Sequence, residues 1–271
     1  MEVKNIIKYS IIFFFLVSSI SNANDYLSRD PNYIDRGKLW GNAHISNFTK
    51  NELSKHNYKV KKDPTGLSPI NLIEDFSPKK GDCGTEEHRH TGINDCISGR
   101  LRLEVGSKKI KKKNKPFETW LGYYIFFPKN FPEDKYFYPY ITQFYLSSNL
   151  QKGGFAPKFA ASLTRNREII SNGKIIISKE NLKGKWHKIE YHIRWSTKKD
   201  GFFRVYHNGL LKSEQNNLIT MTHDQVQIKY GTYSYKDNST MYPPEYKFPS
   251  HSIYYSGVNI SKSRDKLKVN Q

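Results

Sequence analysis

The side chains best suited to chemistry in this sequence lie on three segments that read as β-strands. They are Arg100, Arg102 and Glu104 on the first, Gln143 on the second, and Lys229, Tyr230 and Tyr233 on the third. Arginine, glutamine and tyrosine, together with a histidine, are the groups needed to remove a proton from a carbon beside a carboxylate. The sequence therefore suggests a site that holds an acidic molecule and moves protons.

The first of these strands alternates charged and apolar residues. Because side chains of an extended strand alternate between its two faces, Arg100, Arg102 and Glu104 share one face, and leucine and valine occupy the other. The apolar face then belongs to a hydrophobic core. The charged face lines either a groove or bulk solvent, where an ion pair would have no further role.

The third strand places Lys229 and Tyr233 on one face, with Gly231 between them and Tyr230 on the opposite face. A glycine there leaves room for a ligand to approach the backbone, and the lysine could lower the pKa of Tyr233. Packing in a core is the more ordinary role of such a tyrosine and stays open as the alternative. Gln143 lies among aromatic residues, where its amide needs hydrogen-bond partners or a wet cleft.

Two cysteines, Cys83 and Cys96, are the only ones in the chain. In an exported protein this close pair predicts a disulfide, since the spacing is too wide for a zinc knuckle and no second pair exists. The bond would stabilise the fold by roughly 3 kcal/mol. It would also rigidify a loop that contains His88 and His90. No calcium-loop motif is present, so we expect no metal in the chemistry.

The N-terminus predicts export. Residues 1–23 combine early lysines, an apolar centre and a small-residue cleavage site, which is the pattern of a signal peptide. The apolar run is shorter than the roughly 20 residues of a membrane span. We therefore expect a mature chain of residues 24–271 that is secreted or periplasmic and has no membrane span. A retained membrane anchor is the alternative.

The formal charge of the whole chain is +19, an excess that would attract a polyanion. An exported protein meets polysaccharide more readily than nucleic acid, and no helix-turn-helix, zinc-finger or RNA-binding motif is present. Genome composition is an equally good explanation for the many lysines. We expect a polysaccharide partner, no nucleic-acid partner, no cofactor and a monomer.

Segments rich in aromatic and β-branched residues dominate the chain and read as strands. They are 101–105, 120–127, 140–146, 159–164, 174–178, 187–195, 201–207, 225–235 and 252–261. Asn172-Gly173, Asp200-Gly201 and Asn208-Gly209 between them suit tight hairpins. Helical spacing is scarce, with at most a short helix near 181–185, so we predict a single all-β sandwich or barrel domain.

Two polar stretches flank this pattern. We read the lysine-rich residues 108–115 as a solvated loop, with polyanion contact as the alternative. From residue 262 onward the chain is polar, and we expect it to fray.

The order of several short motifs resembles that of the heparin-lyase and glucuronan-lyase type of polysaccharide lyase. The motifs are Asp82-Cys83-Gly84, Asn94-Asp95-Cys96, Arg100-Leu101-Arg102-Leu103-Glu104-Val105, Glu118-Thr119-Trp120-Leu121-Gly122-Tyr123, Phe127-Pro128-Lys129-Asn130-Phe131-Pro132, Gln143, Trp186, Trp195, Asn208-Gly209, Lys229-Tyr230-Gly231-Thr232-Tyr233 and Ile253-Tyr254-Tyr255-Ser256-Gly257-Val258. The resemblance covers about residues 70–262 and extends more weakly to jelly-roll alginate lyases. One departure is that Phe144-Tyr145 follows Gln143, where the family has a nearby histidine.

The resemblance implies a concanavalin-like β-jelly roll that cleaves a uronic-acid polysaccharide by β-elimination. The C5 proton of a uronic acid is weakly acidic, so the adjacent carboxylate must be neutralised as negative charge develops. Gln143 and Arg102 are our candidates for that neutralisation, with a histidine of the disulfide loop, His90 or alternatively His88, as a third. Tyr233 is the candidate base and acid. Further contacts with substrate are expected from Lys229, which would also support Tyr233 electrostatically, and from Arg100, His88, Glu104, Tyr145 and Tyr230.

Two other functions fit many of the same residues. A non-catalytic carbohydrate-binding sandwich would stack Trp120, Tyr140 and Tyr145 on sugars and hold acidic groups with basic side chains. A glycoside hydrolase of the same fold would need two carboxylates about 5 to 9.5 Å apart. The chain has no Glu-x-Asp-x-x-Glu strand, so hydrolysis is the least favoured of the three.

Overall fold

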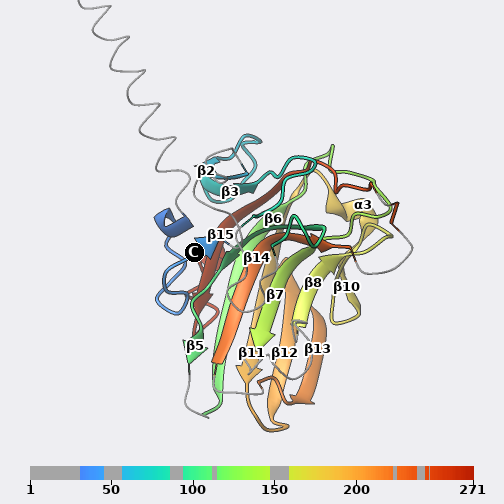
Figure 1. The fold of residues 1–271 in the computed structure, drawn as a ribbon. Coiled ribbons are helices and arrows are strands. Elements are labelled where there is room, and N and C mark those ends of the chain that lie inside the picture. The colour runs from blue at the N-terminus through green and yellow to red at the C-terminus, as the bar shows by residue number, and fades with distance from the viewer. Residues whose placement is uncertain are drawn as a thin grey trace, which may run out of the picture.

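Two antiparallel β-sheets facing each other make up the fold in the computed structural model (Figure 1). The structure describes residues 31–45, 57–85, 94–111, 115–146, 159–221, 225–236, 242–243 and 245–271. Sheet A has the strand order β1 (His44–Ile45), β4 (Arg100–Gly106), β14 (Gln225–Tyr235), β7 (Tyr140–Leu146), β8 (Phe159–Leu163), β9 (Ile169–Ser171) and β10 (Lys174–Ile177), with β5 (Ile110–Lys111) paired to β14.

Sheet B lies behind sheet A in Figure 1. Its strand order is β13 (Leu210–Leu218), β12 (Gly201–His207), β11 (Trp186–Trp195), β6 (Phe117–Phe126), β15 (Ile253–Ser261), β3 (Leu72–Phe76) and β2 (Tyr58–Lys62). Helical structure is limited to η1 (Pro31–Tyr33), α3 (Lys179–Leu182) and η3 (Lys268–Asn270) in the described ranges. The all-β sandwich predicted from the sequence is confirmed.

Each strand predicted from aromatic and β-branched residues is present, within a few residues of its expected ends. The turn at Asn208-Gly209 joins β12 to β13, and both residues have positive φ angles, of 50° and 85°. The strands that were not predicted are β1, β2, β3, β5, β9 and β13. Of these, β13 has a mostly polar sequence. It lies at the edge of sheet B with most of its residues exposed, so it needs no apolar alternation.

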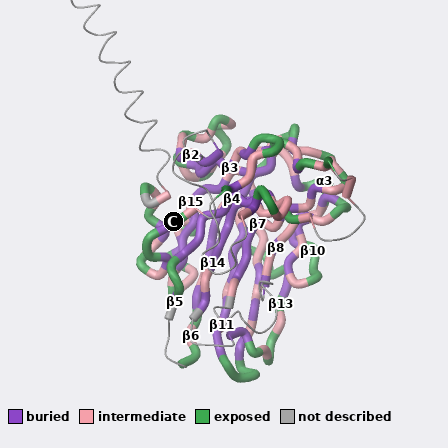
Figure 2. Tube along the Cα trace, in the orientation of Figure 1, coloured by how far each residue is buried: buried purple, intermediate pink, exposed green. Residues whose placement is uncertain are grey.

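The core fills the space between the two sheets, and Figure 2 shows that the strands are largely buried while many of the connecting loops are exposed. Buried tyrosines in this core satisfy their hydroxyl groups internally, as buried polar groups must. The hydroxyl of Tyr255 donates to the carbonyl oxygens of Ile141 and Gly231, at 2.8 and 2.9 Å. These bonds cross from sheet B to the strands of sheet A that carry the candidate site.

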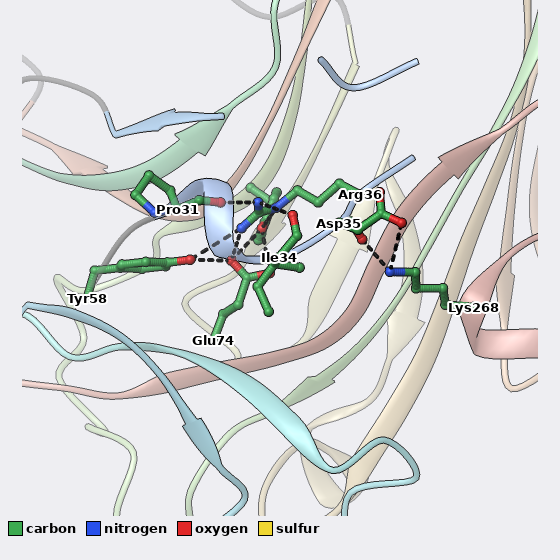
Figure 3. Close-up of polar contacts among 8 residues, drawn as sticks. Pro31, Ile34, Asp35, Arg36, Tyr58, Glu74 and Lys268 are labelled. Atoms are coloured by element: carbon green, nitrogen blue, oxygen red, sulfur yellow. Dashed lines mark hydrogen bonds and ion pairs between the residues drawn. The ribbon is translucent and has the colours of Figure 1, made fainter. Parts of the chain in front are cut away.

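A buried ion pair ties the N-terminal segment to the sandwich (Figure 3). Nη2 of Arg36 lies 2.5 Å from Oε2 of Glu74 on β3, and both side chains are only 2% exposed. The hydroxyls of Tyr58 and Tyr230 donate to Glu74 Oε2 at 2.8 and 2.6 Å. Since Tyr230 belongs to β14, the cluster connects both sheets to the segment that leads into β1.

The C-terminal residues are packed, so the expectation that they fray was wrong. Leu267 and Val269 are buried over Gly122 of β6, where a Cβ atom would lie 2.8 Å from Val269 Cγ2. Arg264 donates to both carboxylate oxygens of Glu190, at 2.9 and 2.7 Å. The tail is polar overall, so the packing of its apolar residues Leu267 and Val269 against the sheet was not predicted.

The lysine-rich stretch is not wholly a solvated loop. Ile110 is buried, and Ile110–Lys111 forms β5, which pairs with Val226 and Gln225 of β14. Residues 112–114 lie outside the described ranges.

Cys83 and Cys96 form the predicted disulfide, with their Cα atoms 5.0 Å apart. The predicted signal peptide, residues 1–23, lies outside the described part of the chain. No helix within the described residues has the length and apolar character needed to span a membrane.

Candidate active site

The outer face of sheet A gathers most of the predicted site residues, because β4, β14 and β7 are neighbours. Lys229 on β14 pairs with Gly106 of β4 and with Gln143 of β7. Further along the same strand, Tyr233 pairs with Arg102 of β4. On β4, the alternate residues Leu101, Leu103 and Val105 lie on the opposite face and are buried in the core. The alternation predicted from the sequence is therefore confirmed for β4.

A chain of hydrogen bonds runs across the centre of this face. The amide Nε2 of Gln143 donates to Oε1 of Glu104, and the Tyr145 hydroxyl donates to Oε1 of Gln143 at 2.7 Å. Gln143 is fully buried, so it has found the partners that its position demanded. The other carboxyl oxygen of Glu104, Oε2, has no hydrogen-bond partner among the described residues.

Arg102 joins the disulfide loop to Tyr233. Its guanidinium carbon lies 4.7 Å from the centroid of the Tyr233 ring, and its Nη2 lies 3.3 Å from Oδ1 of Asp95. Asp95 is completely buried and directly precedes the disulfide residue Cys96. The disulfide thus holds a carboxylate that orients Arg102. Asp95 was not among the predicted site residues, although its place beside a cysteine was a usable signal.

Glu104 and Lys229 face each other in a desolvated setting. Burial raises the pKa of the Glu104 carboxyl, and the charges of Lys229 and Arg102 oppose that rise. Burial also lowers the pKa of the Lys229 ammonium, with Glu104 opposing. Lys229 Nζ lies 5.1 Å from the centroid of the Tyr145 ring. Both shifts favour the uncharged forms of the pair.

The expected lowering of the Tyr233 pKa by Lys229 was wrong. Burial raises the pKa of the Tyr233 hydroxyl, and the cations that oppose the rise are Arg102 and Arg100. Tyr233 is half-buried, and its loss of solvent outweighs the nearby positive charge. The phenol therefore keeps its proton through neutral pH.

Gly231 is required by the local backbone conformation and does not make room for a ligand, so the prediction from sequence was wrong. Its φ is +137°, and a Cβ atom there would overlap the carbonyl oxygen of Leu103 and lie 2.9 Å from Phe76. The pairing of β14 with β7 shifts register between Tyr230 and Tyr233, on either side of this glycine. Such a bulge re-aims the side chains around it, here that of Tyr233.

His44 was not predicted, yet it lies on this face of sheet A. It pairs with Gly106, and a Cβ atom on Gly106 would lie 2.6 Å from the imidazole Cε1. The imidazole therefore lies over the glycine, in the same row as Lys229. Burial and the Lys229 charge lower the pKa of His44. The two-residue strand that carries His44 left too short a pattern to recognise in the sequence.

The remaining predicted residues are distributed differently. Tyr230 is fully buried beside Glu74 on the core side, so the structure does not bring it to the cluster. Arg100 is at the Tyr235 end of the same face. Trp120 lies on sheet B, where its ring stacks on that of His192 with the centroids 4.0 Å apart. It is therefore not on the sheet that carries Tyr140 and Tyr145. His88 and His90 lie outside the described residues.

The described residues contain no group of three or more His, Cys, Asp or Glu side chains that could hold a metal ion. The arrangement offers instead a guanidinium, an amide, an amine and a phenol on three adjacent strands. These groups can bind a carboxylate and exchange protons with a ligand.

A family model described as polysaccharide lyase matches residues 35–259. A search of curated proteins found no match of significance.

Several solved structures share the fold. The endo-β-1,4-glucuronan lyase from the fungus Trichoderma reesei has a TM-score of 0.53 and 13% identity, over 83% of this chain and 92% of that chain. The alginate lyase Aly36B, in complex with an alginate trisaccharide, has a TM-score of 0.51 and 14% identity, over 83% and 89% of the two chains. The catalytic domain of a GH131 β-glucanase from Podospora anserina has a TM-score of 0.54 and 14% identity, over 90% and 94%.

At such low identity these structures establish the fold, a β-jelly roll, and nothing finer, because two lyases and a glucanase share it. The family match is the finding that distinguishes a lyase from a glucanase for this chain. It spans most of the sequence, including every described strand of the candidate site. The chain therefore belongs to the polysaccharide lyase family.

Proposed function

We propose that this protein is an exported lyase that cleaves a uronic-acid polysaccharide by β-elimination at the outer face of sheet A. The observation that carries the proposal is the convergence of Arg102, Gln143, Lys229 and Tyr233 on one face of three adjacent strands. Each group suits one requirement of the reaction. The glucuronan and alginate lyases that share the fold act on acidic sugar chains, which agrees with this substrate class.

The substrate carboxylate is held by Arg102, Gln143 and Glu104. Arg102 supplies a fixed positive charge, and we assign the second N–H of the Gln143 amide to the ligand. We assign Glu104 the protonated form, which burial favours by raising its pKa, and its Oε2 has no partner among the described residues. A protonated acid in an apolar setting can donate a hydrogen bond to an oxyanion. Together these groups stabilise the charge that moves onto the carboxylate.

Lys229 is the base in this mechanism. Its lowered pKa increases the fraction of free amine at neutral and mildly alkaline pH, which is the form that accepts a proton. The amine takes the C5 proton of the uronate. The electron pair of that C–H bond forms the double bond between C4 and C5, and the bond from C4 to the glycosidic oxygen breaks.

Tyr233 is the acid. Its raised pKa keeps the hydroxyl protonated, so it can donate that proton to the departing glycosidic oxygen. The products are a chain with an unsaturated uronate at its non-reducing end and a chain with a new reducing end. The Lys229 ammonium and the Tyr233 phenolate then return to their starting states by proton exchange through solvent.

Export and domain extent complete the proposal. Residues 1–23 have the signal-peptide pattern, and removing them leaves a strongly basic chain, which draws in an anionic polymer. The disulfide is of the kind that persists outside the cytoplasm. We take residues 24–271 as one mature domain, secreted or periplasmic, because the family match covers residues 35–259 without a break.

The test is incubation of the mature chain with glucuronan, alginate, heparin-like and pectic polysaccharides while ultraviolet absorbance is followed. The conjugated double bond produced by elimination absorbs there, and hydrolysis products do not. We expect growing absorbance with at least one of the polymers. Tyr233→Phe should abolish it while binding is retained. Tyr254→Phe is the matched control, since Tyr254 is half-buried on sheet B.

Three results would contradict the proposal in different ways. Binding of an acidic chain without absorbance or chain shortening would indicate a carbohydrate-binding module. New reducing ends without absorbance would indicate a hydrolase, which the shared fold of the β-glucanase permits. Unchanged turnover in Tyr233→Phe would remove Tyr233 from the mechanism while leaving the reaction class in place.

A further inference from the structure

An aromatic recess adjoins the candidate active site at one end of β14. Seven aromatic residues and two serines line it, and it encloses about 370 Å³ of empty space, part of it open to solvent. The recess is separate from the hydrogen-bonded cluster around Gln143, but it shares Tyr233 with the active site.

One wall of the recess is a set of near-parallel rings from neighbouring strands. Tyr140 and Tyr233 have ring centroids 6.0 Å apart with a 24° angle between planes, and Tyr140 and Tyr235 are 6.4 Å apart at 10°. Tyr235 is 40% exposed, so part of this wall is open to a ligand. Tyrosine rings offer an apolar face with a polar edge, which matches the alternating C–H and hydroxyl surface of a sugar ring.

Further lining residues come from segments outside the sheet. The hydroxyls of Tyr138 and Tyr242 are hydrogen-bonded at 2.7 Å. Tyr138 precedes β7, and Tyr242 lies in the connection between β14 and β15. Ser162 of β8 contributes a further hydroxyl to the lining. The recess therefore offers several hydroxyl groups that can bond those of a sugar.

The lining contains no lysine, arginine, histidine, aspartate or glutamate in the part of the chain that the structure describes. Cations nearby lie against the lining tyrosines without contributing to the lining, as Arg165 does 5.7 Å from the Tyr138 ring centroid. Arg102, Lys229 and Glu104 gather on the active-site side of Tyr233. Arg100 pairs with Tyr235 on the neighbouring strand, beside the recess, but does not contribute to its lining. A sugar carboxylate would gain no ion pair with a lining residue inside the recess.

We infer that the recess is a subsite for the sugar on the leaving-group side of the cleaved bond, and that it binds this sugar by ring stacking and hydroxyl contacts whether or not the sugar carries a carboxylate. The inference rests on the proposed function. If Tyr233 protonates the glycosidic oxygen, the uronate that loses its proton lies toward Arg102 and Lys229. The sugar joined through that oxygen then lies on the far side of Tyr233, where the recess is. Polymers in which uronate alternates with a neutral sugar become substrates.

Two measurements test this subsite. The first compares cleavage of an all-glucuronate oligosaccharide with one in which a neutral glucose unit precedes each glucuronate at O4. The mature chain should cleave both with kcat/KM values within about tenfold, which is about 1.4 kcal/mol. Tyr235→Ala should raise KM for both by about tenfold, with kcat nearly unchanged. A hundredfold preference for the all-glucuronate chain, or an unchanged KM in Tyr235→Ala, would overturn the inference.

The second measurement does not need turnover. A neutral glucose tetrasaccharide is titrated into the mature chain and followed by calorimetry and by shifts of tyrosine ring signals in NMR spectra. We expect binding that Tyr235→Ala abolishes and that Tyr254→Ala on sheet B leaves intact. No binding of the neutral tetrasaccharide would overturn the subsite even if elimination occurs. Binding without cleavage of any polymer would retain the recess as a sugar site and refute the lyase mechanism.

Discussion

The side-chain amide of Gln143 donates a hydrogen bond to Oε1 of Glu104, while Oε2 of the same buried carboxyl has no hydrogen-bond partner among the described residues. An ionised carboxylate left half-satisfied in a buried place is costly. A protonated one can donate from Oε2 to a ligand and is unpaired only until the ligand arrives. Because Gln143 occupies Oε1, Oε2 of Glu104 is the atom that can donate to a ligand, and it can do so only when the carboxyl is protonated.

Replacement of Glu104 by glutamine should retain activity within about tenfold of the parent, because the amide keeps an acceptor for Gln143 and supplies an N–H in place of the acid proton. Glu104→Leu keeps much of the volume without the donor and should lower kcat about 100-fold, as loss of one oxyanion donor does. The measurement is the initial rate of double-bond formation. Equal loss in both variants would show that Glu104 acts as a charged carboxylate.

The pH dependence of kcat should follow Lys229 and Tyr233 with opposite signs. Lys229 must be unprotonated, so activity falls as pH drops through its pKa, which burial lowers from the ordinary lysine value. Tyr233 must be protonated, so activity falls as pH rises through its pKa, which burial raises above that of a free tyrosine. Glu104 must also be protonated in this mechanism, so the alkaline limb follows whichever of Glu104 and Tyr233 loses its proton first.

Lys229→Met should remove the acidic limb of that profile together with most of the activity. Lys212→Met is the control, because Lys212 is exposed on β13. Rate profiles of the parent and both variants over a broad pH range provide the check. Residual activity in Lys229→Met that keeps the acidic limb of the parent would contradict the assignment of Lys229 as the base.

Much of the fold was predictable because its signals are local. Aromatic and β-branched runs predicted nine of the strands, but not β1, β2, β3, β5, β9 or β13. Asn208-Gly209 predicted a hairpin whose positive φ angles glycine and asparagine tolerate. The shared face of Arg102 and Glu104 followed from the two-residue period of a strand. Strand β13 escaped because an exposed edge strand does not need apolar residues at alternate positions.

What could not be predicted depends on contacts between distant residues. The pKa of Tyr233 is raised because burial outweighs the field of Arg102, and neither the burial nor the 4.7 Å approach is encoded locally. His44 reaches the site because Gly106 lacks a side chain on the neighbouring strand. Asp95 enters it through the disulfide loop, as the partner of Arg102. Tyr230 was predicted to contact substrate because of its neighbours in the sequence, but its side chain lies on the core face.

Gly231→Ala should both destabilise the fold and lower activity. The added methyl group overlaps the Leu103 carbonyl at a φ of +137°, and strain and overlap each cost roughly 1–3 kcal/mol. Gly173→Ala is the control, since its φ is +74° with no atom within 4 Å of the new Cβ. It should cost only the roughly 1–2 kcal/mol of a left-handed alanine. Urea unfolding measures both, and equal losses would mean that Gly231 is not sterically required.

The buried pair of Arg36 and Glu74 should be strongly non-additive in a double-mutant cycle. Either Arg36→Leu or Glu74→Leu leaves one uncompensated charge at 2% exposure and should cost about 3–5 kcal/mol of unfolding free energy. The double variant removes both charges, so it should be less destabilised than the sum of the two single variants. Because the pair anchors the segment before β1, the single variants should also loosen His44. Hydrogen exchange at Gly106, the backbone partner of His44, reports that effect. Additive losses with unchanged exchange would show that the two residues act independently and do not fix this edge of the site.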